Sequence, residues 1–135
     1  MPAHLFAHSS LEAMDFIMSK QDLGSAKRLN ELLATLAETV DSRADGNPEK
    51  SYTARLLKSG PVRCGKKIAE EGAEVALAIA AETRKDVAAE TADLLFHLLV
   101  GLRVRGVQLD MVADALSERR GVSGIAEKAA RQTKA

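Results

Sequence analysis

The chain has 135 residues, the size of one domain, and 19 Lys and Arg balance 19 Asp and Glu to a formal charge of zero. That balance argues against a nucleic-acid binder, which normally carries a basic excess on one surface. No apolar run approaches the roughly 20 residues that span a bilayer, which disfavours a membrane role. A lone cysteine and a start that is neither basic nor continuously apolar favour a reducing cytoplasm over secretion.

Composition also predicts an all-α fold. Three Phe, one Tyr and no Trp leave small and aliphatic side chains to fill the core, which suits closely packed helices. The last proline is Pro61, so nothing after it forbids a long helix. We expect an antiparallel helical bundle of about four main helices, completed by oligomerisation.

The pattern divides the chain into three parts. Residues 1–27 are expected to be an N-terminal extension, 28–120 an all-α domain, and 121–135 a partly ordered C-terminal tail. Within the extension, Ser9 and Glu12 have the spacing of a capping box that would open a short helix.

The first helix of the domain is predicted over residues 26–43. The turn residues 45–48 then end it, and a short helical segment follows within residues 51–60. Either Ser51 or the Asn47-Pro48 pair could cap that segment. The first helix has one apolar face with helical spacing, made of Leu29, Leu32, Leu33, Leu36 and Val40.

Three further helices are predicted over residues 62–82, 85–105 and 109–120. Pro61 opens the first of them, and Gly106 is a favourable residue to end the second. The first two would form an antiparallel hairpin that turns near residue 83. The second helix has more apolar surface than one hairpin can bury, which predicts a homodimer or larger homo-oligomer: Leu94, Leu95, Phe96, Leu98, Leu99, Val100 and Leu102.

Helix 62–82 carries an acidic face. At about 100° per residue, Lys67, Glu70, Glu71 and Glu74 fall within one arc. Apolar residues, including Ile68, Val75 and Ile79, are expected on the opposite side, so that the two faces are separate. A third strip of small side chains would let another helix approach: Ala69, Ala73, Ala76 and Ala80.

Helix 85–105 has a matching acidic face. Glu90, Asp93 and His97 follow the i, i+3, i+7 spacing. An antiparallel hairpin that turns near residue 83 places Glu74 opposite Asp93 and Glu71 opposite His97. Carboxylates would then converge from both helices, and their mutual repulsion is costly unless a cation lies between them.

Oxygen ligands of this kind favour a hard ion, Mg²⁺ first, with Mn²⁺ as a possible substitute. Mg²⁺ usually shares its ligands with substrate phosphates, which indicates phosphate chemistry. A di-iron bundle site would instead need Glu-x-x-His pairs, which these glutamates lack.

Several of these motifs also occur together in other proteins. Glu71-x-x-Glu74, a gap, and then Glu90-x-x-Asp93 match the metal signature of the all-α nucleoside triphosphate pyrophosphohydrolases. More specific runs lie on either side of it: Ser51-Tyr-Thr-Ala54, Lys67-x-x-Glu70-Glu71 and Asp93-Leu-Leu-Phe-His97-Leu-Leu-Val100. With these runs, residues from about 29 to 131 resemble the phosphoribosyl-ATP pyrophosphatase family.

The resemblance implies hydrolysis of phosphoribosyl-ATP to phosphoribosyl-AMP and pyrophosphate, the second step of histidine biosynthesis. It implies Mg²⁺ held by Glu71, Glu74, Glu90 and Asp93, and a water that attacks the α-phosphorus. Glu70, Glu71 and Glu74 are the candidate catalytic residues. Glu70 would either position and deprotonate the attacking water, or hold the metal ligands in place without binding the ion itself.

Candidate phosphate-binding residues lie near the start of the acidic helix. Lys67 could contact phosphate or neutralise the carboxylates of an empty site, and Ser51 could simply cap a helix. His97 is expected to support the ligands rather than bind the ion, because a hard ion prefers oxygen. Cys64 is expected to be an inert small side chain. The full phosphate-binding set is Ser51, Tyr52, Thr53, Arg55, Lys66 and Lys67.

Two other functions fit parts of the pattern. A house-cleaning pyrophosphohydrolase of free nucleoside triphosphates would share the carboxylate signature. That signature does not require the run from Ser51 to Thr53, so the presence of this run speaks against this alternative. A non-catalytic helical adaptor would carry the acidic residues as solvated surface, and it predicts no metal binding.

Overall fold

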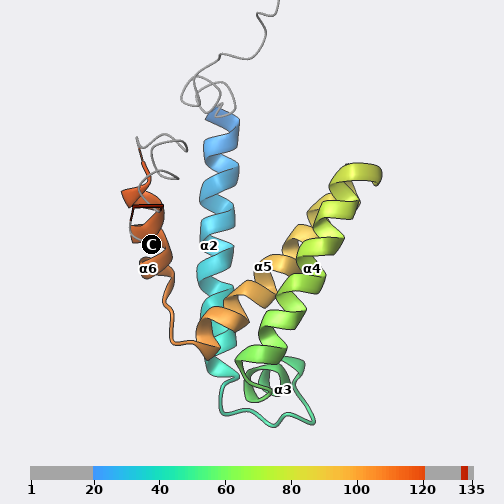
Figure 1. The fold of residues 1–135 in the computed structure, drawn as a ribbon, viewed down its shortest axis with the longest axis vertical. Coiled ribbons are helices and arrows are strands. Elements are labelled where there is room, and N and C mark those ends of the chain that lie inside the picture. Colours follow the sequence, from blue (N-terminus) through green and yellow to red (C-terminus); the bar gives the residue numbers. More distant parts are fainter. Residues whose placement is uncertain (1–19, 121–131, 134–135) are drawn as a thin grey trace, which may run out of the picture. The chain divides into compact units, whose positions relative to one another are not determined.

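The computed structural model describes residues 20–120 and 132–133. Over these residues the chain forms five helices and no strand, so the predicted all-α class is confirmed (Figure 1). Residues Leu33–Val112 form one compact unit, which holds every candidate site residue. The expected capping box at Ser9 and nearly all of the tail 121–135 lie outside the described residues. The helices are α2 (Lys20–Ser42), α3 (Tyr52–Lys58), α4 (Pro61–Ala81), α5 (Arg84–Val104) and α6 (Leu109–Glu118).

Helix α2 begins at Lys20, earlier than the expected residue 26. Asp22 lies in its first turn, where a negative charge interacts favourably with the helix dipole. Gly24 is only weakly unfavourable within a helix, so it does not end α2. Of the expected apolar face, Val40 is buried, Leu33 and Leu36 are half-buried, and Leu29 and Leu32 are exposed.

Ser51 caps the short helix α3. Its hydroxyl oxygen accepts a hydrogen bond from the Ala54 amide at 3.2 Å, which satisfies one of the free N–H groups of the first turn. The Asn47 side chain instead accepts from the Glu49 amide at 2.8 Å, within the preceding turn. Of the two caps that the sequence allowed, the structure therefore uses Ser51.

The two ends of α5 are fixed by local hydrogen bonds. Thr83 and Asp86 form a capping box, in which each side chain accepts from the backbone amide of the other. At the other end, Gly106 adopts a φ of 67°, and the amides of Gly106 and Val107 donate to the carbonyls of Arg103 and Leu102. This is a Schellman arrangement, and Gly106 ends the helix as the sequence predicted.

Helices α4 and α5 pack as the predicted antiparallel hairpin, and α3 contacts both of them (Figure 1). At Gly101, a Cβ atom would lie only 2.7 Å from Ile68 Cδ1, so the missing side chain permits close approach. The buried residues of α4 are Cys64, Glu71 and Ala78.

One expectation about α4 is wrong. Glu71 is buried on the same side of the helix as Cys64 and Ala78, so the acidic and apolar faces are not separate. Ile79 and the strip of small side chains are exposed in the single chain, and the approach of another helix to that strip stays a prediction: Ala69, Ala73, Ala76 and Ala80. Periodicity gave the angular order of these residues, but only the position of α5 decides which of them are covered.

The core joins one residue from each of four helices: Val40, Leu56, Cys64 and Val100. The Cys64 thiol is 2 % exposed and donates to the Leu56 carbonyl at 3.3 Å, which agrees with an inert packing role. Arg103 of α5 forms an ion pair with Asp41 of α2 beside this cluster. The cluster thus connects α2 and α3 to the hairpin.

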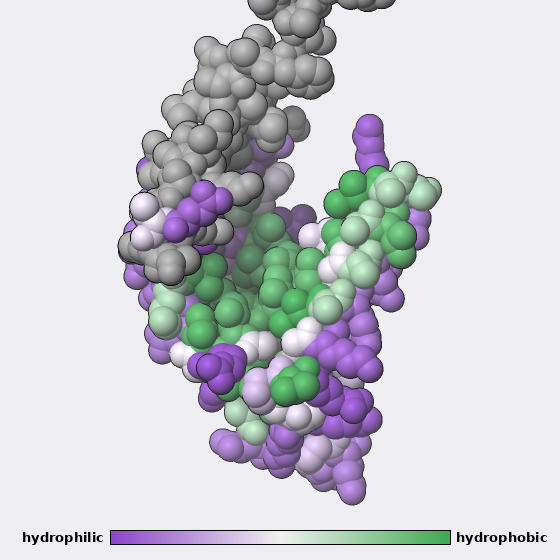
Figure 2. Space-filling model, viewed as in Figure 1, coloured by the Kyte–Doolittle hydropathy of each residue, from purple (hydrophilic) through white to green (hydrophobic). Residues whose placement is uncertain are grey.

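Apolar side chains also remain on the surface. Val62, Leu77 and Ile79 of α4 are 86 %, 65 % and 69 % exposed. Figure 2 shows apolar side chains gathered over α4 and α5. Of the apolar residues expected along α5, only Leu99 and Val100 are buried. The excess apolar surface anticipated from the sequence is therefore present.

Replacing Leu56 by alanine should lower the free energy of unfolding by about 2–5 kcal/mol, because it leaves a cavity where four helices meet. Urea denaturation followed by circular dichroism measures the change. Lys58→Ala is the matched control on the exposed side of the same helix and should change stability by less than about 0.5 kcal/mol. Equal effects of the two substitutions would contradict the assigned core.

Candidate active site

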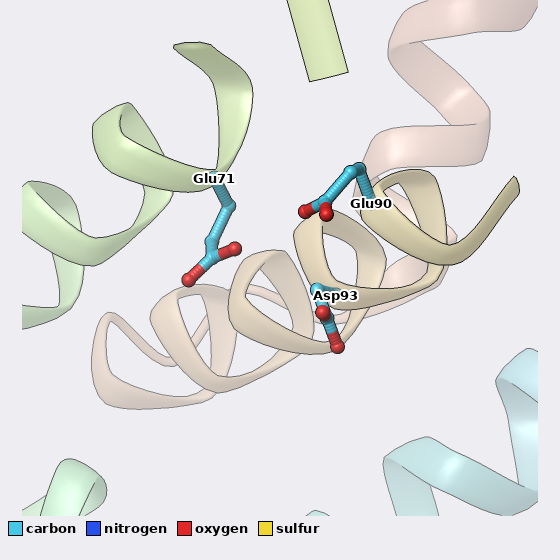
Figure 3. Close-up of side chains that lie close together, drawn as sticks. All are labelled: Glu71, Glu90 and Asp93. Carbon is cyan, nitrogen blue, oxygen red and sulfur yellow. The ribbon is translucent and has the colours of Figure 1, made fainter. Parts of the chain in front are cut away.

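Three carboxylates meet across the hairpin. Glu71 of α4 and Glu90 and Asp93 of α5 each offer an oxygen, and these oxygens lie within 4.8 Å of one another. Figure 3 shows the Glu71 and Glu90 side chains reaching toward each other from the two helices. Glu71 is 7 % exposed, whereas Glu90 is half-buried and Asp93 is exposed. The cluster therefore has a buried side and a side open to solvent.

Glu74 belongs to the same group of charges. When protonated it hydrogen-bonds to the Glu71 carboxylate, and the negative charges of Glu71 and Glu90 act in the same direction, so the pKa of Glu74 is raised. The sequence-based expectation that carboxylates from both helices converge is thus supported. The part of this rise in pKa that comes from the negative charges of Glu71 and Glu90 is repulsion, which a cation in this position would relieve.

Lys67 supplies the positive charge next to the cluster. Its Nζ lies 2.9 Å from Glu71 Oε1 and 3.2 Å from Glu70 Oε2. These hydrogen bonds, first with Glu71 and then with Glu70, raise the pKa of Lys67. The bond from Lys67 in turn lowers the pKa of the buried Glu71 carboxyl, against the opposing effect of burial. Of the two roles considered for Lys67, the observed contacts are those of charge neutralisation.

Glu70 lies on the solvent side of these residues. Its side chain is 47 % exposed and pairs with Lys67 and, at 4.0 Å, with Lys66. It is therefore next to the cluster without being one of the three residues whose oxygens converge.

His97 faces Glu71, as the hairpin geometry predicted. Its Nδ1 lies 2.8 Å from the Asp93 carbonyl oxygen and 3.8 Å from Glu71 Oε1. Its Nε2 lies 3.2 Å from the Tyr52 hydroxyl. Both ring nitrogens are thus engaged with the protein, which fits a supporting role. The contact with Tyr52, across 45 positions of sequence, is one that sequence reasoning did not anticipate.

The other candidate phosphate contacts lie around α3. Ser51 is used as its cap, and Arg55 Nε donates to the Pro48 carbonyl at 3.1 Å. Thr53 is half-buried within the first turn. Only Tyr52 of this group is joined to the carboxylate face through a hydrogen bond in the structure, and the bond runs through His97.

A separate hollow of about 220 Å³ lies between α2, α5 and the start of α6. Its lining is mostly apolar and shares no residue with the carboxylate cluster. The carboxylate cluster therefore lies on the hairpin and outside this hollow, whose two charged lining residues, Asp41 and Arg103, pair with each other. The hollow is lined by Ala37, Val40, Asp41, Leu99, Leu102, Arg103, Val107, Gln108 and Leu109.

Comparison with known proteins shows which family this chain belongs to. Residues 33–120 match the family described as phosphoribosyl-ATP pyrophosphohydrolase. The chain belongs to this family. It is 48 % identical over 100 residues to phosphoribosyl-ATP pyrophosphatase 1 of Rhodopseudomonas palustris, covering 74 % of this chain and 94 % of the relative. It is 46 % identical over 106 residues to phosphoribosyl-ATP pyrophosphatase of Caulobacter vibrioides, covering 78 % and 98 %.

A third relative, phosphoribosyl-ATP pyrophosphatase of Rhodobacter capsulatus, is 46 % identical over 99 residues, which cover 73 % of this chain and 96 % of that protein. The family match contains the cluster residues, Lys67, His97 and the whole of α3. The family that the motifs indicated is therefore confirmed. Among the described helices, none combines the length and apolar character of a membrane span.

The crowding of carboxylates predicts a dependence of stability on pH. The pKa of Glu74 is higher in the folded state than in the unfolded state. Between these two pKa values, the folded state therefore binds more protons than the unfolded state. The contribution of Glu74 to stability therefore falls as pH rises through that range. The lowered pKa of Glu71 acts with the opposite sign, so a comparison of variants is needed to isolate Glu74.

In EDTA at low ionic strength, Glu74→Gln should raise the Tm relative to the wild type, and the difference should grow as the pH rises above the ordinary glutamate pKa of 4.5. Thermal unfolding measures it. Glu38→Gln, an exposed position on α2, is the control and should show no such growth. A lower Tm for Glu74→Gln throughout would mean that the repulsion is not present.

Proposed function

We propose that this protein hydrolyses phosphoribosyl-ATP with Mg²⁺ held on the α4–α5 hairpin by Glu71, Glu74, Glu90 and Asp93. Family membership confirms the predicted activity, phosphoribosyl-ATP pyrophosphatase, an enzyme of histidine biosynthesis. The observation that carries the assignment of the site is the convergence of carboxylate oxygens from two helices inside the matched region.

The chemistry of the donor set fits Mg²⁺. The three groups whose oxygens converge are all carboxylates, and hard divalent ions prefer such oxygens. The neighbouring imidazole nitrogens are already bonded to Tyr52 and to the Asp93 carbonyl. Bound there, Mg²⁺ would neutralise charge on the phosphate oxygens and on the departing pyrophosphate; Mn²⁺ is a possible substitute.

Glu70 is the proposed base for the attacking water. It is more exposed than Glu71, and Lys67 holds one of its oxygens at 3.2 Å, so its carboxylate is oriented yet accessible. Proton transfer from the water to Glu70 would accompany bond formation at the α-phosphorus and cleavage of its bond to the β-phosphate oxygen. An alternative role for Glu70 is to anchor Lys67 and thereby Glu71.

Lys67 and Lys66 are the proposed phosphate contacts on α4. A cation bound to Glu71 would compete with Lys67 for the same carboxylate oxygen, leaving the ammonium free to reach a phosphate. Lys66 is 77 % exposed and pairs only loosely with Glu70, so it can reorient at little cost. Ser51, Thr53 and Arg55 are weaker candidates, because the cap and the loop already use Ser51 and Arg55.

We also propose a homodimer or larger homo-oligomer in the cytoplasm. The support is the exposed apolar surface of α4, together with the half-buried apolar side chains along α5; a soluble monomer would rarely leave such a surface in contact with water. The division into an extension (1–27), a catalytic domain (28–120) and a tail (121–135) is part of the same proposal. The family match, over residues 33–120, falls inside the proposed domain.

Pyrophosphate release tests the function. The wild type with Mg²⁺ should hydrolyse phosphoribosyl-ATP, and EDTA should abolish the activity. Glu90→Gln should lower kcat at least about 100-fold, since losing a ligand should cost more than the roughly 10–100-fold of a change outside the ligand shell. Glu82→Gln, exposed at the end of α4, is the control and should retain activity.

The same assay separates the alternatives. Faster turnover of ATP, dCTP or dUTP than of phosphoribosyl-ATP would indicate a house-cleaning pyrophosphohydrolase. Inactivity toward all of these nucleotides, together with no Mg²⁺ binding, would leave the non-catalytic adaptor.

The oligomer is tested by sedimentation equilibrium. The expected mass is at least twice the 14.4 kDa of one chain. Leu77→Glu places a charge on the exposed apolar surface of α4 and should weaken assembly. Ala34→Glu, at an exposed position of α2, adds the same single negative charge and is the control. A monomer at all concentrations would exclude this proposal without affecting the metal site.

A further inference from the structure

Tyr52 and His97 connect the start of α3 to the carboxylate face of the hairpin. The Tyr52 hydroxyl oxygen lies 3.2 Å from His97 Nε2. On the other side of the ring, Nδ1 lies 2.8 Å from the Asp93 carbonyl oxygen and 3.8 Å from Glu71 Oε1. His97 thus touches two residues assigned to the metal, and Tyr52 reaches them through its ring.

The chemistry of these atoms fixes the direction of the hydrogen bonds. A backbone carbonyl can only accept, so His97 Nδ1 must carry a hydrogen and donate to Asp93. In a neutral imidazole the other nitrogen, Nε2, is then an acceptor. With the ring neutral, the Tyr52 hydroxyl therefore donates to Nε2.

This direction leaves Tyr52 without a proton for a phosphate. A phenol has one O–H group, and phosphate oxygens accept hydrogen bonds from it. While Tyr52 donates to His97, it cannot also donate to a substrate phosphate. Its ring is 50 % exposed but held in place, with its centroid 6.4 Å from that of Phe96 and 6.2 Å from that of His97.

We infer that Tyr52 is a positioning residue for the metal ligands and not a phosphate contact. This inference rests on the proposed function. Tyr52 donates to Nε2 and so fixes the position of the His97 ring, whose Nδ1–H donates to the backbone carbonyl of Asp93 and which lies against the buried Glu71 carboxylate. The two ligands from opposite helices are thereby set before the ion arrives, which raises the affinity of the site.

The test compares Mg²⁺ affinity in the absence of substrate with the kinetics in its presence. Tyr52→Phe removes only the hydroxyl. It should raise the Kd for Mg²⁺ by about tenfold in titration calorimetry, the lower end of the effect of residues behind metal ligands. At saturating Mg²⁺, KM for phosphoribosyl-ATP should stay within about twofold, because no substrate contact is lost.

Ser59→Ala is the matched control. It removes a hydroxyl that donates to the Leu56 carbonyl at 2.6 Å at the other end of α3, and it should leave both constants unchanged. His97→Asn keeps a donor near Nδ1 but loses Nε2, so it should weaken Mg²⁺ binding as Tyr52→Phe does. The double variant should be no weaker than the single ones, because both interrupt one interaction.

Nitrogen-15 spectra of the His97 ring supply a readout that needs neither metal nor activity. They should show Nδ1–H in both proteins, because the Asp93 carbonyl accepts from Nδ1, and a changed Nε2 chemical shift in Tyr52→Phe, where the hydrogen bond from the hydroxyl is lost. A KM raised tenfold in Tyr52→Phe with an unchanged Kd for Mg²⁺, or an Nε2–H ring in the wild type, would overturn the inference. A wild type that neither binds Mg²⁺ nor releases pyrophosphate would instead contradict the proposed function, so the two failures are distinguishable.

Discussion

The structure depends on holding negatively charged carboxylates close together across the α4–α5 hairpin. Glu71 lies within the helix contact and is 7 % exposed, and the Glu90 and Asp93 oxygens reach within 4.8 Å of it. Such a cluster needs a compensating charge, which Lys67 provides at 2.9 Å from Glu71. It also needs a rigid frame, since the helices would otherwise separate. The capping box at Thr83 and the close contact at Gly101 supply that frame.

The same helix, α5, contributes residues to the hydrophobic core and to the carboxylate site. Val100 is buried in the core one turn after His97, so the packing that joins four helices also fixes the ring beside Glu71. Tyr52 extends the same connection to α3. Substitutions in the core should therefore disturb the carboxylate face as well as stability, because helix α5 serves both.

Much of this could be predicted from the sequence. The short interval between two long helical patterns specified a hairpin, and the hairpin specified that Glu71 faces His97, as observed. The burial of Glu71 could not be predicted, because periodicity orders side chains around a helix without saying which direction the neighbour occupies. The Tyr52–His97 bond joins residues 45 positions apart and depends on how α3 docks. The early start of α2 was missed because its first turns lack an apolar periodic signal.

The most direct test of the central claim, that these carboxylates bind the catalytic ion, is a crystal structure with Mn²⁺ in place of Mg²⁺. Anomalous scattering should place the ion among Glu71, Glu74, Glu90 and Asp93, with the Lys67 ammonium displaced from Glu71. An ion bound elsewhere on the chain, or a hairpin without an ion and with Lys67 still paired to Glu71 at saturating Mn²⁺, would contradict the account.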